Sequence, residues 1–154
     1  MPEQDRLPDV RTTAQAWESL FRAQVAVMRR LQGLPEFRKL SIREYDVLFN
    51  LSRCPTGWSR LNVLNEALLI SQPSLSRMVE RLEAKGLLQR RPAEQDQRGI
   101  ELSLTEAGRE LQRAIGREHV RHLHEMIAPA LSTEEFDQLR ALTDKLRDGL
   151  RPMR

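Results

Sequence analysis

Residues 93–104, AEQDQRGIELSL, place an acid and an arginine close together on a predicted turn. Asp96 and Arg98 precede a run in which Ile100 and Leu102 have the spacing of a half-buried strand. A guanidinium on a thin projection can enter a DNA minor groove, where narrow A·T-rich geometry deepens the negative potential. Because the acid would repel phosphate, we predict that it fixes the guanidinium by a short-range ion pair. The alternative is a charged surface turn with no partner.

A second set of polar side chains opens a predicted helix at residues 72–85. Gln72 can pair bidentately with adenine, and Arg77 can reach guanine or phosphate. The helix start adds free N–H groups and the positive end of the helix dipole. On the other side of the helix, Leu75 and Leu82 belong to an apolar stripe that packs inward. An ordinary solvated surface is the alternative reading of the polar side.

Cysteine and histidine give weaker indications of chemistry. Cys54 is the single cysteine, so an intramolecular disulfide is excluded and no second thiol can resolve a sulfenic acid. His119 and His122 share a helix face with His124 nearby, but no set of acids or cysteines accompanies them. We therefore expect a structural cysteine and surface or pocket histidines, with a redox switch or a metal site as the alternatives.

Aromatic side chains recur at helical spacing in the first two predicted helices. They predict a ligand crevice, with His119 or Arg22 available for an anion. The predicted lining residues are Trp17, Phe21, Tyr45, Phe49 and His119. Packing in the core is the alternative, and it is the usual role of aromatics at this spacing.

Length and composition limit the class of protein. The chain has 154 residues, 25 basic and 22 acidic, and a net charge of +3, which favours an acidic partner only weakly. No apolar run has the length of a membrane span, and the N-terminus lacks a signal-peptide pattern, so we expect a cytoplasmic protein that does not associate with membranes. Because Gly-rich phosphate loops and nucleophile motifs are absent from the sequence, we predict no enzyme activity and no cofactor.

Periodicity and capping residues predict the elements that must position these side chains. Ser41 with Glu44, and Ser132 with Glu135, have the spacing of capping boxes. Gly86 suits the left-handed end of the helix that precedes the hairpin. The predicted elements are a flexible arm at 1–11, helices at 12–31, 41–53, 61–68, 72–85, 105–128 and 132–150, and a two-stranded hairpin at 87–104.

This order predicts a mainly α (α+β) fold, a winged helix-turn-helix with flanking dimerisation helices. The winged unit occupies residues 41–104, and the flanking helices occupy 12–33 and 105–150 of one domain at 12–150. The flanking helices are amphipathic and lie outside the winged unit, so their apolar stripes require a partner. A second copy would supply it, and a two-fold pair reads a palindrome with half-sites about one helical turn apart.

The segments ISQPSLSRMVERLEAKGLLQR and DQRGIELSLTEAG resemble the MarR family of bacterial transcription regulators. The resemblance covers about residues 12–150. It implies an obligate homodimer, a minor-groove arginine at Arg98 oriented by Asp96, and an effector such as a small aromatic or phenolic anion, an oxidant or a metal. Arg91 lies near the base of the hairpin. The residues expected to contact DNA are Ser71, Gln72, Ser74, Ser76, Arg77, Arg81, Arg91, Asp96 and Arg98.

We therefore expect a sequence-specific regulator, acting as a repressor on double-stranded DNA, that a small-molecule effector releases. One alternative is a winged helix used only for protein contacts, which would tolerate neutralisation of Arg77, Arg91 and Arg98. The other is a redox- or metal-sensing regulator of the same fold.

Overall fold

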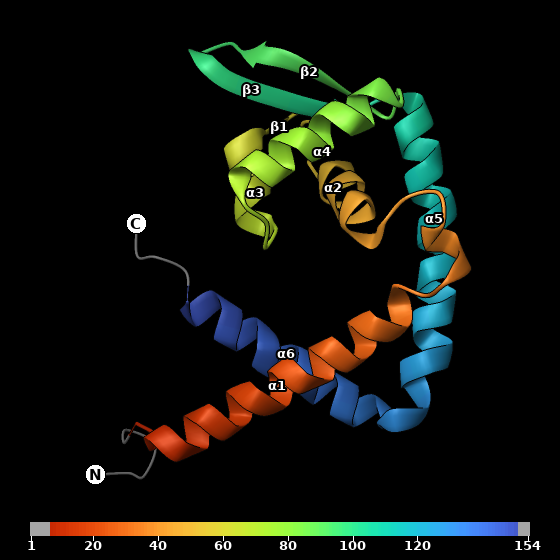
Figure 1. Ribbon diagram of the computed structural model, residues 1–154. Coiled ribbons are helices and arrows are strands. Elements are labelled where there is room, and N and C mark those ends of the chain that lie inside the picture. The colour runs from red at the N-terminus through yellow and green to blue at the C-terminus, as the bar shows by residue number, and fades with distance from the viewer. Residues whose placement is uncertain (1–6, 151–154) are drawn as a thin grey trace. The chain divides into compact units, whose positions relative to one another are not determined.

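The computed structural model describes residues 7–150, and Figure 1 shows the elements in chain order. The chain divides into two compact units, one ending at Ile115 and the other beginning at Gly116. The elements are α1 (Val10–Leu31), η2 (Pro35–Phe37), α2 (Ile42–Ser52), β1 (Ser59–Arg60), α3 (Leu61–Ala67), α4 (Gln72–Ala84), β2 (Leu88–Ala93), β3 (Asp96–Leu104), α5 (Glu106–Ile127), η3 (Ala128–Ala130) and α6 (Thr133–Gly149).

Both predicted capping boxes are confirmed. Ser41 Oγ accepts the N–H of Glu44 at 3.2 Å, and the Glu44 carboxylate accepts the N–H of Ser41 at 3.0 Å. Ser132 and Glu135 make the same two bonds at the start of α6. Two donors that the helix itself cannot satisfy are paired in each case, which fixes where α2 and α6 begin.

The predicted N-terminal arm extends too far into the chain. Helix α1 begins at Val10, because the carboxylate of Asp9 accepts the N–H of Thr12 at 2.8 Å and caps the helix before the predicted start. Residues 1–6 of the predicted arm lie outside the described residues.

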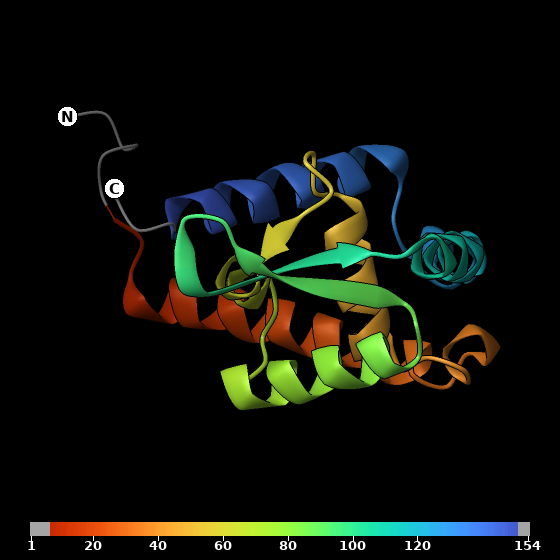
Figure 2. The same ribbon diagram turned by 90° about the horizontal axis from the view of Figure 1, so that it is seen from above.

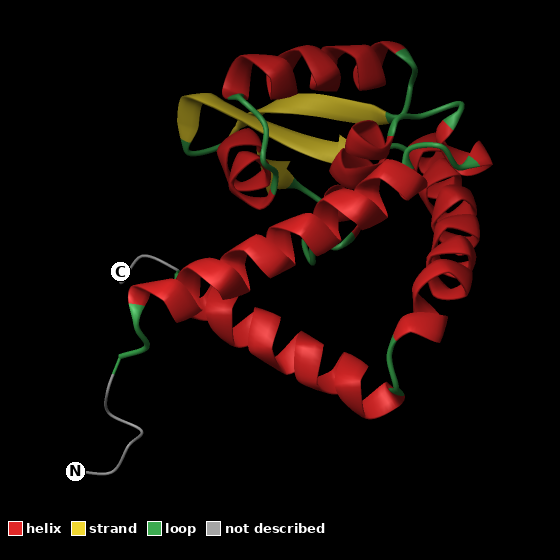
Figure 3. Cartoon of the chain, turned by 60° about the horizontal axis from the view of Figure 1, so that its bottom comes forward, coloured by secondary structure: helices red, strands yellow, loops and turns green. Residues whose placement is uncertain are grey.

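The hairpin belongs to a three-stranded antiparallel sheet of order β1-β3-β2, which Figure 2 and Figure 3 show beside the helices of the first unit. The prediction of two strands missed β1, which aligns Ser59 with Leu102 and places β3 in the middle. In the hairpin, Leu88 lies opposite Leu104, and the register shifts between Pro92 and the following residue. The third strand braces the base of a ribbon that two strands alone would hold only marginally.

The core of the first unit lies where α2 and α4 meet the sheet. Ile100 was predicted to support the hairpin, but it is 37% exposed because it lies toward the tip, opposite Pro92. The hairpin is therefore anchored at its base and free at its tip. The largest fully buried side chains are Leu40, Val47, Leu48, Leu75, Val79, Leu82, Leu88 and Leu102.

A close junction joins α4, β2 and the first turn of α5. Gly86 ends α4 with φ +73°, and its carbonyl oxygen accepts the Thr105 hydroxyl at 2.6 Å. The same hydroxyl oxygen accepts the N–H of Gly108 at 3.1 Å. A Cβ on Gly108 would overlap the carbonyl oxygen of Leu87. The Leu-Thr-x-x-Gly sequence therefore holds the start of α5 directly against the turn between α4 and the hairpin.

The second unit contains the rest of α5 and the whole of α6. Its apolar side chains are largely open to solvent: Leu142 on α6 is 66% exposed and Val120 on α5 is 64% exposed. None of the helices in residues 7–150 combines the length and apolar character needed to cross a bilayer.

Candidate nucleic-acid interface

The first turn of α4 presents short polar side chains. Ser71 Oγ accepts the N–H of Ser74 at 3.4 Å and donates to the Ser74 hydroxyl at 2.8 Å. Gln72 and Arg77 are exposed, whereas Leu75 is fully buried. The free N–H groups of a helix start therefore lie beside hydroxyls, an amide and a guanidinium, a combination that can bind phosphate or base edges.

The guanidinium groups of α4 differ in their surroundings. Arg77 is exposed, and its Nε donates to the Pro73 carbonyl oxygen at 3.4 Å. Arg81 is drawn toward the start of α2, with its Nε 3.9 Å from the Glu44 carboxylate, which also lies 3.6 Å from Lys85 Nζ. Glu44 therefore neutralises part of the charge at the far end of α4, whereas Arg77 lies nearer the start of the helix.

The hairpin turn holds Asp96 in a different role from the predicted one. Its Oδ1 accepts the backbone N–H of Arg98 at 3.0 Å, and no ion pair joins the two side chains in the part of the chain that the structure describes. A carboxylate reaches the N–H two residues on within its own turn, so this bond needs no reorganisation of the long arginine side chain. The acid shapes the turn, and the exposed Arg98 guanidinium extends from it.

The tip of the hairpin and the first turn of α4 lie toward the same side of the first unit, as Figure 1 and Figure 2 both show. One compact unit thus carries an exposed helix start and an arginine-bearing turn that can contact the same extended polyanion. Of the predicted DNA-contacting residues, Ser74, Ser76 and Arg91 are half-buried, and Ser71, Gln72, Arg77, Arg81, Asp96 and Arg98 are exposed.

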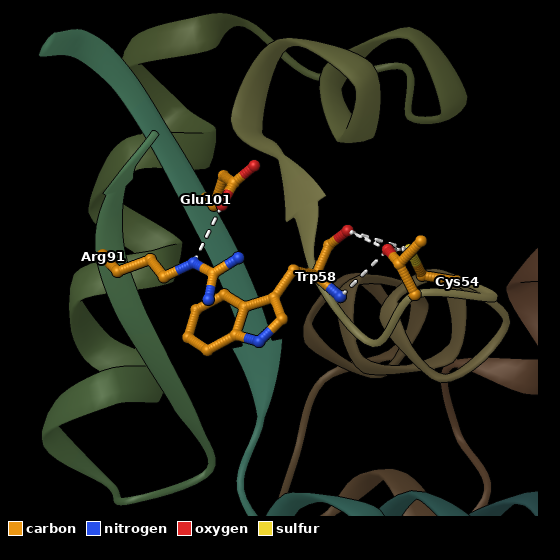
Figure 4. Close-up of polar contacts among 5 residues, drawn as sticks. Cys54, Trp58, Arg91 and Glu101 are labelled. Atoms are coloured by element: carbon orange, nitrogen blue, oxygen red, sulfur yellow. Dashed lines mark hydrogen bonds and ion pairs between the residues drawn. The ribbon is translucent and has the colours of Figure 1, made fainter. Parts of the chain in front are cut away.

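Arg91 makes two contacts midway along the hairpin. Its Nε lies 2.8 Å from Glu101 Oε2 on the neighbouring strand, and its guanidinium carbon lies 3.9 Å from the centre of the Trp58 ring (Figure 4). Trp58 could not be assigned a role from the sequence, since a lone aromatic before a two-residue strand belongs to no periodic pattern. The neighbouring Arg90 pairs with Glu83 of α4 at 2.7 Å.

The residues of the predicted ligand crevice come from α1, α2 and α5. On α1, the Trp17 and Phe21 rings lie 6.0 Å apart and are 62% and 49% exposed. Tyr45 is buried and stacks on Phe49 at 6.0 Å, and burial raises the pKa of its hydroxyl. Tyr45 therefore fills the core of the first unit, and His119 belongs to the second unit.

A cavity of about 390 Å³ opens elsewhere in the first unit, between α1, α2 and the segment that leads into α4. Its walls are mainly apolar, with the opposite charges of Arg43 and Asp46 at one side. Since Met78 of α4 forms part of the wall, an occupant would touch the helix that carries the exposed polar turn. The lining residues are Gln24, Met28, Arg43, Asp46, Ala67, Leu68, Leu69, Ile70 and Met78.

Cys54 is half-buried and donates its S–H to the Trp58 carbonyl oxygen at 3.0 Å. Its thiol thereby helps hold the loop between α2 and β1. Within residues 7–150, no three His, Cys, Asp or Glu side chains are grouped so that they could hold a metal ion.

Comparison with known proteins places the chain in a family. Residues 39–99 match the model of the MarR family. The HTH-type transcriptional regulator PecS of Dickeya dadantii (strain 3937) is 34% identical over 134 residues, which cover 86% of this chain and 80% of PecS.

Solved structures agree with this assignment. AbsC, a MarR family transcriptional regulator from Streptomyces coelicolor, has a TM-score of 0.76 at 26% identity and covers 95% of this chain and 98% of its own. Bordetella bronchiseptica BpsR, whose DNA binding is regulated by 6-hydroxynicotinic acid, has a TM-score of 0.73 at 25% identity and covers 86% of this chain and 98% of its own. The chain belongs to the MarR family of transcriptional regulators.

Proposed function

We propose that this protein binds a palindromic DNA duplex as a homodimer and represses transcription from it. The observation that supports this most directly is that the first turn of α4 and the tip of the hairpin lie toward the same side of a compact unit. Arg98 lies close to that tip, in β3. In the proposed complex, Gln72 and Arg77 read the major groove and Arg98 enters the adjacent minor groove. Ser71, Ser74 and Ser76 bind phosphates or base edges close to the helix, and Arg81 supplies charge at its far end.

The dimer is proposed from the exposed apolar side chains of the helices that flank the winged unit. Trp17 on α1 and Leu142 on α6 are 62% and 66% exposed, and Leu139, Leu146 and Leu150 extend the apolar side of α6. Apolar surface of this extent is costly in water and marks an interaction site. A second copy of the chain has the matching faces, and two-fold pairing duplicates the α4 and Arg98 contacts for the two halves of a palindrome.

Replacing Leu142 with glutamate is expected to weaken the dimer, because a carboxylate would be buried without a partner. Light scattering at micromolar concentration should give about twice the 17.9 kDa chain mass for the wild type and a concentration-dependent lower mass for the variant. Arg140→Glu, which places the same group on the opposite face of α6, should stay dimeric. A wild type that is monomeric under these conditions would reject the dimer.

Binding to the preferred duplex is expected to weaken steeply with salt. If about 8 phosphates are neutralised per dimer, log K should fall against log[salt] with a slope of about −7. We would select the duplex from a random pool and measure binding by fluorescence anisotropy from low to physiological salt, with a scrambled duplex of equal length as the control. A slope near zero would instead favour a winged helix that makes only protein contacts.

We also propose that a small aromatic or phenolic anion binds the 390 Å³ cavity and releases DNA. The regulation of BpsR by 6-hydroxynicotinic acid supports this effector class. Within the cavity, Arg43 can receive the carboxylate, and an occupant would contact Met78 of α4.

A panel of aromatic acids, with Zn²⁺ and peroxide as the alternative signals, should contain an acid that raises the unfolding temperature and lowers DNA affinity. Arg43→Gln should remove this shift, whereas Arg140→Gln should keep it. A response to Zn²⁺ or peroxide alone would instead identify a metal or redox sensor.

A further inference from the structure

We propose that Arg91 is a positioning residue that clamps the middle of the hairpin to the segment before β1 and so sets the direction of Arg98. This inference rests on the proposed DNA binding. It replaces direct DNA contact, the role expected for Arg91 from the sequence, with an indirect one. The clamp consists of Arg91, Glu101 and Trp58, which Figure 4 shows together.

The guanidinium of Arg91 is engaged from two directions. Its Nε lies 2.8 Å from Glu101 Oε2, and the ring centre of Trp58 lies 3.9 Å from its guanidinium carbon. The Glu101 side chain is only 19% exposed and that of Arg91 is 41% exposed, so this pair is screened less than an open surface pair. Displacing the guanidinium from this position would break both contacts.

The sheet register places Glu101 on the central strand between positions of both neighbouring strands. In β3 it lies opposite Arg91 of β2 and opposite Arg60 of β1. Residues directly opposite one another in a sheet lie on the same face, so one carboxylate stands between two guanidinium-bearing positions. Arg91 thus joins the outer strand of the hairpin to the central strand, and through Trp58 it also reaches the chain before β1.

Hydrogen bonds within the loop between α2 and β1 hold the backbone of Trp58. The Trp58 carbonyl oxygen accepts the Cys54 thiol at 3.0 Å and the Thr56 hydroxyl at 2.9 Å, and the Trp58 N–H donates to Thr56 Oγ1 at 3.4 Å. These bonds fix the backbone of Trp58 at the end of the turn that follows α2. The Trp58 ring is therefore held in place by the loop after α2, and the guanidinium of Arg91 stacks on it.

This attachment matters because the far end of the hairpin has little other support. Ile100 is 37% exposed, and the fully buried contacts of the hairpin come from its base, at Leu88 and Leu102. A small change in direction at Arg91 therefore becomes a larger displacement at Arg98. Holding this part of the hairpin fixed reduces the conformational freedom that DNA binding would otherwise have to remove.

The test compares Trp58→Leu and Arg91→Lys with the wild type, using the full chain and the selected duplex. Lysine keeps the charge but loses the planar stacking and the fork geometry. We expect each substitution to lower affinity about tenfold, and the double variant to be no weaker than about tenfold, because both residues belong to one clamp. Arg140→Lys, at an arginine paired with Asp137 on α6, should bind like the wild type.

Two further measurements separate positioning from direct contact and from general destabilisation. The salt slope should stay unchanged in Trp58→Leu and in Arg91→Gln, whereas loss of one phosphate contact per protomer would reduce it by about 2 per dimer. Arg98→Ala should cost less affinity in the Trp58→Leu background than in the wild type, since a misdirected hairpin has already lost part of that contact. If Trp58→Leu only made the protein less stable, Arg98→Ala would lower the affinity in that background by as much as in the wild type.

Fluorescence tests the clamp in the free protein. The chain has two tryptophans, so Trp17→Phe leaves Trp58 as the only reporter. We expect Arg91→Lys to change Trp58 emission while the unfolding temperature stays close to that of Trp17→Phe. This measurement does not use Trp58→Leu, so it tests the clamp even if that variant fails to fold.

Three results would overturn the inference: wild-type affinity in Trp58→Leu, a salt slope reduced by Arg91→Gln, or unchanged Trp58 emission in Arg91→Lys. The binding of the wild type to DNA distinguishes failure of the proposed function from failure of the clamp. If the wild type ignores every duplex, the proposed function fails. If the wild type binds and the clamp variants bind equally well with the same slope, only the clamp fails.

Discussion

Replacing Arg98 with alanine is expected to weaken DNA binding by about 1–3 kcal/mol per half-site, or about 5- to 150-fold for each. The reason is that Arg98 is exposed on the hairpin turn, where the narrow minor groove would strengthen its attraction. Anisotropy titrations with the selected duplex measure the loss. Arg140→Ala removes the same side chain from α6 and should leave affinity unchanged. If Arg98→Ala binds as tightly as the wild type, the hairpin has no part in recognition.

The neighbouring Asp96 provides a companion test of how the turn is built. Asp96→Asn keeps an oxygen that can accept the Arg98 N–H but removes the charge, whereas Asp96→Ala removes both. We therefore expect asparagine to retain the affinity of the wild type, or to increase it, and alanine to reduce it. Equal losses in both variants would show that the charge of Asp96, and not its backbone bond, is what DNA binding requires.

Gly108→Ala is expected to destabilise the protein by on the order of 3 kcal/mol or more. Alanine normally favours a helix over glycine by about 0.5–1 kcal/mol, so propensity alone predicts the opposite sign. The added methyl would overlap the Leu87 carbonyl oxygen, and backbone cannot move aside as a flexible side chain can. Relief of the overlap would separate the start of α5 from the turn after α4 and break the bonds through Thr105.

Urea denaturation followed by circular dichroism measures this effect. Gly149→Ala is the matched control, because it also lies in a helix and a Cβ there meets nothing within 4 Å. The control should be neutral or slightly stabilised. If Gly108→Ala were stabilised to the same degree, the close approach at Leu87 would not be present in solution.

Local hydrogen-bond chemistry explains why much of the fold could be predicted. The Ser41–Glu44 box depends on residues three apart, and the end of α4 at Gly86 depends on one residue that tolerates positive φ. Strand β1 was missed, since two residues carry no alternation and Ser59 is paired only through contact with a distant strand. A pattern that involves only neighbouring residues cannot predict that Ser59 pairs with a strand far away in the sequence.

In the candidate site, too, the features set by neighbouring residues could be predicted and those set by distant contacts could not. The exposed polar start of α4 follows from helix geometry, so it could be predicted from the sequence. The Asp96 bond was assigned to the wrong partner, because turn backbone geometry decides it and charge alone suggested the guanidinium. The stacking of Arg91 on Trp58 joins two segments that only the folded sheet brings together, and neither segment indicates the other.

The order β1-β3-β2 leaves β2 as an outer strand, and this has a consequence for self-association through the sheet. An open strand edge is a template on which another chain can add, which leads to aggregation. Here Pro92 lacks an N–H to offer, the register is irregular beside it, and charged side chains occupy the preceding positions. The outer strand is therefore a poor template for fibril growth. The hairpin can stay extended in a crowded solution without pairing with strands of other molecules.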